Sequence, residues 1–329
     1  MKAMVLTAGL GTRLRPFTEV IPKPAMPFFG KPICLYATSL LESFGVNSFT
    51  YNLHYLPEIM SSTIKENLSK PEREIHFSHE KNEILGSGGA LEFCKSEFIN
   101  EDIFFLANGD EILIPEKGFS IDRILKDHID RKRLCTLICI EHQEAGKEFG
   151  GVWIDSNSSI KGFGRESITG SEQVLHYTGF AILSKRIFDY LPDGESNILY
   201  DAVTDGIQNG ELVVAEKIQA TWIETGNEKG FVQAHEEIIE LFKKQENKYL
   251  KNYIQAIASP ELDKYFQICR SSPKLNFKFI NGEVIESSSW GLSFGKNVSF
   301  ENVQDRCIVI ANGYNIQSKS KDYKIKFIK

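Results

Sequence analysis

Two glycines and two cations near the start of the chain have the types and spacing of a phosphate-binding loop. Gly9 and Gly11 follow a short apolar run, and Arg13 and Lys23 come after them. Glycine lets backbone N–H groups approach an anion with no side chain in the way, and the two cations add full positive charge. The pattern therefore predicts a loop that holds a phosphate group.

Lys23 stands between two prolines, Pro22 and Pro24. Proline fixes its own φ angle and pushes the preceding residue towards extended geometry. We therefore expect Lys23 to be presented to the phosphate from a stiff segment.

Two better-known phosphate motifs are excluded by single residues. A Walker loop requires Ser or Thr after Gly-Lys, but Pro32 follows the Gly-Lys pair at residues 30–31. A dinucleotide-binding fingerprint requires a third glycine at the position that Leu14 occupies.

The opening loop resembles the signature of the sugar-1-phosphate nucleotidylyltransferases, also called NDP-sugar pyrophosphorylases. The matching residues are Ala8-Gly9-x-Gly11-Thr12-Arg13-Leu14-Arg15-Pro16-x-Thr18 and then Pro22-Lys23-Pro24. In this family the loop binds the nucleotide. The resemblance therefore implies nucleotide contacts from Leu6, Ala8, Gly9, Gly11, Thr12, Arg13 and Lys23.

A second glycine-rich stretch, residues 83–91, runs into a predicted helix. Bare backbone in such a turn can lie against a flat base or a phosphate, although a tight start of the helix explains the glycines equally well. In the resembling family a stretch of this kind holds the base. The resemblance therefore implies that the base and the ribose contact Glu83, Ser87, Gly88 and Gly89.

Asn108-Gly109-Asp110 ends an apolar strand that is predicted over residues 102–110. A carboxylate at this place suits Mg²⁺, which prefers hard oxygen ligands; the alternative is an Asx turn in which Asp110 caps the backbone. The resemblance favours the metal and adds Asn108 to the nucleotide site. The Asn-Gly-Asp form looks most similar to mannose-1-phosphate guanylyltransferases and N-acetylmuramate-1-phosphate uridylyltransferases.

Trp222-x-Glu224-x-Gly226 matches a family motif in which an aspartate is the second protein ligand of the catalytic metal. Glutamate supplies the same oxygens on an arm one methylene longer, and Mg²⁺ tolerates poor octahedral geometry badly. We therefore expect the metal site to be kept, shifted or weakened.

A hairpin predicted over residues 149–163 begins the part of the chain that would hold the acceptor. The resemblance implies sugar contacts from Gly150, Thr178 and Gly179. Many family members also carry a lysine in Phe-x-Glu-Lys-Pro, and this chain lacks it. Arg165 could supply the charge instead, or Glu166 could hold a sugar hydroxyl.

Strands and helices alternate along most of the chain. Helices are predicted over residues 31–44, 56–68, 120–130, 184–190 and 197–209, and strands over 48–53, 74–78, 102–110, 133–140 and 211–216. This alternation predicts an α/β fold with a doubly wound, mostly parallel sheet, in which ligands bind beyond the carboxyl ends of the strands. With the resemblance, it indicates the Rossmann-like nucleotide-diphospho-sugar transferase fold.

The composition restricts the partners and the location. A length of 329 residues with 42% hydrophobic residues allows one large domain and a smaller one. A net charge of -6 argues against a nucleic-acid partner, and six cysteines without a CxxC pair favour reduced, mostly buried thiols. The sequence shows no signal peptide and no apolar run as long as a membrane span, which predicts a cytoplasmic protein without membrane contact.

We expect a catalytic domain over residues 1–245 and an extension over residues 246–329, which begins with a helical linker. Short segments between residues 285 and 316, punctuated by Gly and Asn, resemble coils of the left-handed β-helix that ends many family members. One or two such coils cannot bury a core alone. We therefore expect the small β-rich extension to pack on the catalytic domain or on another subunit, which suggests a homo-oligomer.

The resemblance implies a reaction in which a sugar 1-phosphate attacks the α-phosphorus of a nucleoside triphosphate and expels pyrophosphate. The phosphate nucleophile is already ionised near neutral pH, so catalysis should come from positioning and charge neutralisation rather than from a general base. We assign Arg13 to the β- and γ-phosphates and Lys23 to the α-phosphate or the incoming phosphate. Asp110 and Glu224 are assigned to Mg²⁺.

Two other functions stay open. Glu224 and the missing lysine would also suit a catalytically silent regulatory subunit that binds NDP-sugar without releasing pyrophosphate. The altered residues 163–167 leave room for a non-sugar acceptor such as phosphocholine, which would make the protein a cytidylyltransferase.

Overall fold

The computed structural model describes residues 1–227 apart from 16, 20, 29–30, 69–72 and 117, helical positions 230–231, 233–234 and 237–238, and strands beyond residue 275. The chain forms two compact units. The first consists of Met1–Gly9 and Ala37–Trp222, and the second of Leu10–Tyr36 and Ile223–Lys329. Each unit therefore joins segments that are distant in the sequence.

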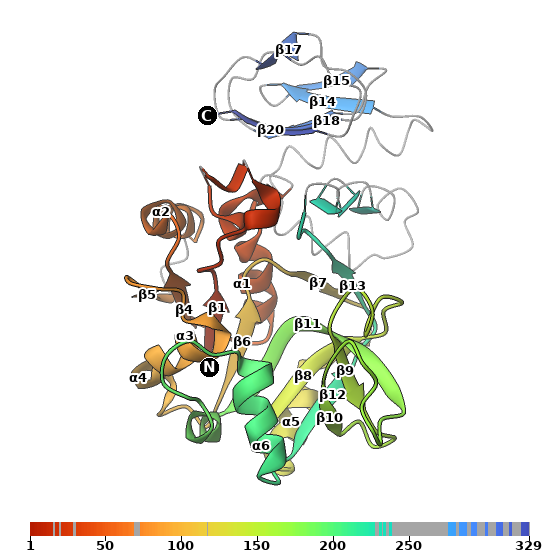
Figure 1. The fold of residues 1–329 in the computed structure, drawn as a ribbon. Coiled ribbons are helices and arrows are strands. Elements are labelled where there is room, and N and C mark those ends of the chain that lie inside the picture. The colour runs from red at the N-terminus through yellow and green to blue at the C-terminus, as the bar shows by residue number, and fades with distance from the viewer. Residues whose placement is uncertain are drawn as a thin grey trace. The chain divides into compact units, whose positions relative to one another are not determined.

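The first unit is built on a nine-stranded sheet with strand order β10-β9-β11-β6-β1-β4-β5, in which β8 pairs with β11 and with β12 (Figure 1). The strands are β1 (Lys2–Leu6), β4 (Ser48–Leu53), β5 (Glu74–His79), β6 (Ile103–Asn108), β8 (Cys135–Ile140), β9 (Gly151–Ile154), β10 (Ile160–Gly164), β11 (Gln173–Ser184) and β12 (Val213–Lys217). β1 pairs in parallel with β4 and β6, β4 with β5, and β8 with β12. The predicted α/β, Rossmann-like fold is confirmed.

Within this sheet, β11 is the strand that the sequence analysis does not predict. It pairs antiparallel with β6, β8 and β9. Its register shifts between Tyr177 and Phe180, so Thr178 and Gly179 form an irregularity within the strand. Gly179 has φ 84, a left-handed conformation that suits glycine. Such irregularities often lie next to functional sites because they redirect the strand.

The helices are α1 (Cys34–Ser43), α2 (Pro57–Asn67), α3 (Gly86–Phe93), α4 (Lys95–Phe98), α5 (Ile121–Asp130) and α6 (Thr204–Gln208). The predicted start of the first helix at Lys31 is wrong, because β3 (Lys31–Pro32) pairs with β2 (Pro27–Phe28). The predicted helix over residues 197–209 is split into a π-helical segment, Ile198–Val203, and α6. Two further strands, β7 (Ile112–Pro115) and β13 (Ala220–Ile223), pair with each other.

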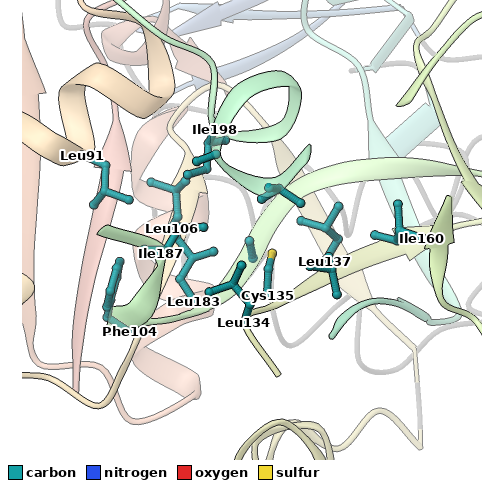
Figure 2. Close-up of a cluster of buried hydrophobic side chains, with 14 of the residues drawn as sticks. Leu91, Phe104, Leu106, Leu134, Cys135, Leu137, Ile160, Leu183, Ile187 and Ile198 are labelled. Atoms are coloured by element: carbon teal, nitrogen blue, oxygen red, sulfur yellow. The ribbon is translucent and has the colours of Figure 1, made fainter. Parts of the chain in front are cut away.

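A hydrophobic cluster within the first unit fixes these elements on the sheet (Figure 2). It joins Leu106 of β6, Leu137 of β8 and Leu183 of β11 to Leu91 of α3 and Ile198 of the π-helical segment, and all of them are buried. Full burial of such a side chain contributes about 1.5–3 kcal/mol. The cluster therefore anchors both α3 and the π-helical segment.

Four cysteines are buried thiols, as the sequence predicts: Cys34, Cys94, Cys135 and Cys139. Burial raises the pKa of each thiol, to about 11 for Cys94. β8 places Cys135 and Cys139 in the core, so they contribute packing. The side chains of Cys269 and Cys307 lie outside the described residues.

In the second unit, the segment Leu10–Tyr36 begins with three short 3-10 turns, Thr12–Leu14, Phe17–Glu19 and Lys23–Ala25. Its small core includes a residue from far along the chain. The Phe28 ring lies edge-on to Tyr36 at 5.6 Å and to Phe231 at 5.9 Å between ring centroids. Tyr36 Oη also donates to the Phe28 carbonyl at 2.6 Å.

Every described residue beyond 275 lies in a strand. β14 (Asn276–Ile280) and β15 (Glu283–Ser287) pair antiparallel, whereas β16 (Gly291–Phe294), β18 (Cys307–Ala311) and β20 (Lys324–Ile328) pair in parallel, as do β17 (Phe300–Glu301) and β19 (Ile316–Gln317). In the three-stranded set, the residues that pair are 291, 307 and 324, which are steps of 16 and 17 residues. Parallel strands at a short, nearly constant step are typical of solenoids. The left-handed β-helix and the domain boundary at residue 245 stay predictions, and the linker helix lies mostly outside the described residues.

Candidate active site

The two glycines of the opening loop have different surroundings. A Cβ added to Gly9 would have no atom of the described residues within 4 Å apart from its chain neighbours. A Cβ added to Gly11 would lie 2.9 Å from Thr18 Cγ2 and 3.1 Å from Lys23 Cβ. Gly11 also has φ 61, and its carbonyl accepts a hydrogen bond from Thr18 Oγ1 at 2.8 Å. Gly11 therefore serves the close packing of its own loop, and Gly9 leaves its backbone open.

The two predicted phosphate ligands of the loop differ in burial. Lys23 begins the turn Lys23–Ala25 and is only 6% exposed. Arg13, in the turn Thr12–Leu14, is exposed. A buried ammonium group is costly unless hydrogen-bond acceptors or an anion compensate it. The loop therefore offers one deeply set cation and one at its surface.

Glu224 lies beside two glycines that leave room for its carboxylate. An added Cβ on Gly226 would collide with Glu224 Oε1, and one on Gly230 would lie 2.7 Å from Glu224 Oε2. The same Cβ on Gly226 would lie 3.1 Å from Arg13 Nη2, so a carboxylate and a guanidinium converge on this glycine. The longer arm of the glutamate, relative to the aspartate of the family motif, thus has a space of its own.

Asp110 follows β6 in a tight turn that β1 holds in place. The Gly109 N–H donates to the Leu6 carbonyl at 2.8 Å. A Cβ on Gly109 would lie 2.7 Å from both Leu6 O and Thr7 Cγ2, so a larger residue does not fit. Asp110 is half-buried and stands at the carboxyl end of β6, the edge where doubly wound sheets bind ligands.

A buried polar network that the sequence analysis missed connects this edge to α3. The Thr7 N–H donates to Asn52 Oδ1 at 2.7 Å, and Asn52 Nδ2 donates to Glu80 Oε1 at 2.7 Å. Glu80 Oε2 accepts from the Leu85 N–H at 2.9 Å. Buried polar groups are normally satisfied in this way. In the sequence, the available signal for this network was the presence of polar residues at the ends of two apolar strands.

The glycine-rich stretch owes its composition to a close contact with residues 194–197. A Cβ on Gly88 would lie 2.6 Å from Ser196 Oγ, and a Cβ on Gly89 would collide with the carbonyl oxygen of Gly194. Close packing of α3 against these residues therefore requires glycine at both positions.

The assignment of this stretch to the base stays a prediction. Ser87 Oγ accepts a hydrogen bond from the Ile198 N–H at 2.9 Å, which ties α3 to the π-helical segment. Glu83 is exposed before the start of α3.

The irregular middle of β11 brings predicted nucleotide and sugar residues together. A Cβ on Gly179 would lie 3.0 Å from Asn108 Nδ2 and 2.8 Å from Glu111 Cγ. Thr178 is fully buried, and its Oγ1 donates to the Ile138 carbonyl at 2.8 Å. The hydroxyl of Thr178 is therefore engaged in the sheet, and the sugar contact of Thr178 stays a prediction.

Four aromatic rings form a cluster: His142, Phe149, His176 and Trp222. Between ring centroids, His176 lies 4.2 Å from Trp222, 5.1 Å from Phe149 and 5.5 Å from His142. Trp222 Nε1 donates to Glu111 Oε2 at 2.8 Å. The cluster therefore links the predicted sugar side to the residue that follows the predicted metal ligand.

His176 is a packing residue of this cluster. It is 8% exposed, and neither ring nitrogen has a hydrogen-bond partner among the described residues. Burial, with a smaller contribution from His142, lowers the pKa of His176 to about 4. The imidazole is therefore neutral near pH 7.

The hairpin of β9 and β10 carries the remaining predicted sugar residues. Gly150 precedes β9. Within the described part of the chain, and apart from its chain neighbours, the only atom within 4 Å of an added Cβ is Tyr200 Oη at 3.2 Å. Arg165 Nη2 donates to the Glu148 carbonyl at 3.0 Å, so its guanidinium braces the chain just before Gly150. Glu166 is exposed, and its sugar contact stays a prediction.

A family model identifies the class of protein that this fold and site define. The model described as "Nucleotidyl transferase" matches residues 2–240. The matched range contains the opening loop, the turn at Asp110 and Glu224. The chain therefore belongs to the nucleotidyl transferase family.

Curated relatives agree with the resemblance found in the sequence. The chain is 28% identical over 233 residues to the mannose-1-phosphate guanylyltransferase catalytic subunit beta of Xenopus tropicalis, which covers 70% of this chain and 63% of the relative. It is 28% identical over 250 residues to the UTP–glucose-1-phosphate uridylyltransferase of Synechocystis sp., which covers 71% of this chain and 62% of the relative. The match thus spans less than two thirds of each relative. The sequence-based recognition is therefore confirmed at the level of the nucleotidyl transferase family.

A solved structure shows the same fold. The UDP-glucose pyrophosphorylase from Acinetobacter baumanii aligns with a TM-score of 0.62 at 17% identity, over 78% of this chain and 98% of that chain. Among the described residues, no helix is both long enough and apolar enough to cross a membrane.

Proposed function

We propose that the protein transfers a nucleotidyl group from a nucleoside triphosphate to a sugar 1-phosphate and releases pyrophosphate and an NDP-sugar. The observation that carries this proposal is the opening loop, in which the backbone at Gly9 is open and Lys23 is a deeply set cation. Family membership and relatives named for mannose 1-phosphate and glucose 1-phosphate support it.

The transfer exchanges one bond at phosphorus for another. An oxygen of the acceptor phosphate bonds to the α-phosphorus while the bond from that phosphorus to the β-phosphate oxygen breaks. Two unit charges about 4 Å apart repel by roughly 1 kcal/mol in water and about 4 kcal/mol at an effective dielectric of 20. We assign Arg13 to the departing β- and γ-phosphates and Lys23 to the α-phosphate or the incoming phosphate, because fixed charges lower this repulsion without reorganisation.

We assign Mg²⁺ to Asp110 and Glu224. Carboxylate oxygens are the donors that Mg²⁺ prefers, and the room beside Gly226 and Gly230 supports a carboxylate on a longer arm at position 224. The metal, when bound, would supply positive charge to the phosphates. Gly109 serves this assignment by fixing the turn that carries Asp110.

The acceptor is assigned to the face around Gly150 and Gly179, and the base to the stretch at residues 83–89. A cytoplasmic location and a homo-oligomer stay predictions of the sequence. The silent regulatory subunit remains the second candidate because glutamate replaces the aspartate of the family motif at position 224.

Pyrophosphate release over a matrix of substrates tests the proposal. The matrix combines ATP, GTP, UTP, CTP and dTTP with the 1-phosphates of mannose, glucose, N-acetylglucosamine and N-acetylmuramate, and with phosphocholine, in the presence of Mg²⁺. We expect one combination of a nucleoside triphosphate and a sugar 1-phosphate to give by far the highest rate of pyrophosphate release. A rate only with CTP and phosphocholine would support the cytidylyltransferase, and a blank matrix with NDP-sugar binding would support the silent subunit.

A matched pair of lysine variants shows whether the opening loop carries the reaction. Lys23→Ala should lower kcat about 10²–10³-fold, because it removes a preorganised charge from the reacting phosphates. Lys161→Ala removes a hairpin lysine that pairs with Asp155 at 2.9 Å and should leave kcat unchanged. Equal rates in both variants would contradict the role of Lys23.

A further inference from the structure

We propose that Tyr200 determines which acceptor the enzyme accepts, by placing its ring and hydroxyl against the sugar of the incoming sugar 1-phosphate beside Gly150. The inference rests on the proposed function and names a specificity residue that the sequence motifs do not contain. Tyr200 is a large aromatic residue that is 52% exposed, unlike most aromatic side chains of the described first unit.

The hydroxyl of Tyr200 lies close to Gly150 on the proposed acceptor side. Tyr200 Oη lies 3.2 Å from the position of a Cβ on Gly150, and apart from the chain neighbours of Gly150 no other atom of the described residues lies within 4 Å of that position. Gly150 is itself exposed. The phenol hydroxyl has no hydrogen-bond partner among the described residues, so it is available to a ligand that settles on Gly150.

The π-helical segment holds Tyr200 in this place from the inside. Ile198, Ala202 and Val203 of the segment are buried in the core, and Ile198 appears beside Leu106 and Ile187 in Figure 2. With one face of the segment buried, Tyr200 is left on the opposite face. π-Helical turns are rare and are often found at functional sites.

Polar contacts fix the start of this turn. Asn197 Oδ1 accepts from the N–H groups of Leu199 at 2.9 Å and Tyr200 at 3.1 Å. The Ile198 N–H donates to Ser87 Oγ at 2.9 Å, so the turn is tied to α3, the helix at the predicted base site. The Tyr200 ring also lies edge-on to Phe163 of β10, with 6.0 Å between ring centroids. The side chain is therefore preorganised although half of it is exposed.

A continuous set of contacts connects Gly150 to the predicted metal ligand. Phe149, the preceding residue, packs against Trp222 with 5.4 Å between ring centroids. Trp222 Nε1 in turn donates a hydrogen bond to Glu111, which follows Asp110. A sugar ring at Gly150 would thus lie at one end of a row of contacts within the first unit, and Asp110 lies at the other end.

Tyrosine has the chemistry that a pyranose requires. A sugar ring has apolar C–H faces and a rim of hydroxyls, and tyrosine combines an apolar ring with one donor and acceptor group. Binding sites use a few placed polar groups of this kind to fix the orientation of a ligand. A hydroxyl at a fixed position discriminates between sugars that differ in the orientation of one hydroxyl group.

The test compares two epimeric acceptors in Tyr200→Phe and Tyr200→Ala. The acceptors are the best sugar 1-phosphate of the substrate matrix and its C2 or C4 epimer. Tyr200→Ala should raise the KM of the best acceptor about tenfold, and Tyr200→Phe should change the ratio of kcat/KM between the epimers about threefold or more. The KM of the nucleoside triphosphate should stay unchanged.

Tyr190→Phe is the matched control, because its hydroxyl bonds to Glu211 at 3.2 Å and it lies outside the proposed site. A purely structural role of Tyr200 would lower kcat/KM for both epimers by the same factor, and that result, or no change, would overturn the inference. If the unmodified protein shows no turnover in the matrix, the proposed function fails and the inference fails with it. Tyr200→Phe keeps the ring and remains decisive if Tyr200→Ala does not fold.

Discussion

The opening loop at residues 10–36 and the proposed acceptor side around Gly150 are built in opposite ways. The loop keeps Gly11, Arg13 and Lys23 within one short segment, and its own turns place them. The acceptor side gathers Gly150, Tyr200 and the aromatic cluster from separate elements of the first unit. A phosphate has one shape, which a few backbone groups and cations can bind from a contiguous segment. A sugar has groups on all sides and needs side chains from several directions.

A pair of glycine variants tests a second contrast, between Gly9, which has open space around it, and Gly89, which packs against residues 194–197. Gly89→Ala should lower the free energy of unfolding by about 3 kcal/mol, because its Cβ would collide with backbone at Gly194. Gly9→Ala has free space, so it should leave stability within about 0.5 kcal/mol and instead raise the KM of the nucleoside triphosphate. Urea unfolding and steady-state kinetics separate the two effects. The contrast would be wrong if Gly9→Ala unfolded the protein while Gly89→Ala left it stable.

The acid stability of the protein tests whether the aromatic cluster is packed and neutral. The pKa of His176 in the folded protein, about 4, lies below the value of about 6.5 for the unfolded chain. The unfolded chain therefore binds more protons in acid, and the stabilisation is complete above pH 6.5 and is lost as the pH falls towards 4. At pH 5 the loss is about 2 kcal/mol.

His176→Phe should keep the ring packing and reduce the loss of unfolding free energy between pH 7.5 and pH 5 by about 2 kcal/mol. Urea unfolding at the two pH values measures it, with His79→Phe at an exposed histidine as the control. An unchanged pH dependence in His176→Phe would show that this imidazole is accessible to protons in the folded protein.

The space around the Glu224 carboxylate provides a test with a smaller expected effect. It concerns the unit that contains the opening loop. Gly230→Ala places a Cβ 2.7 Å from Glu224 Oε2 and should displace the carboxylate. We expect the Mg²⁺ concentration for half-maximal rate to rise about tenfold, which corresponds to about 1.4 kcal/mol. Glu224→Asp in the Gly230→Ala background shortens the arm and should remove the collision. An unchanged Mg²⁺ requirement in Gly230→Ala would argue against a metal role for Glu224.

The sequence predicts the parts of the fold that depend on local patterns. The apolar runs at β1, β4 and β6 and the periodicity of α2 and α5 indicate their elements to within a few residues. The opening loop is recognisable because its glycines and cations are neighbours in the chain. The start of α1 is wrong because the pairing of Lys31–Pro32 with Pro27–Phe28 competes with the helical pattern.

The acceptor side resists prediction because its parts meet only through tertiary structure. β11 lacks a simple alternation, since both of its faces are largely buried and its middle is irregular at Thr178 and Gly179. The position of Tyr200 over Gly150 depends on a contact between residues that are distant in the sequence. No local pattern of residues encodes this contact.

The reverse reaction tests the central claim most directly. The protein would be incubated with Mg²⁺, pyrophosphate and, in separate assays, GDP-mannose and UDP-glucose, together with the NDP-sugar of the best pair in the substrate matrix. A nucleotidylyltransferase must convert one of these NDP-sugars into a nucleoside triphosphate and a sugar 1-phosphate, and Lys23→Ala must lose this conversion. Binding of the NDP-sugar without any nucleoside triphosphate formed would contradict the account and identify the chain as a silent binding subunit.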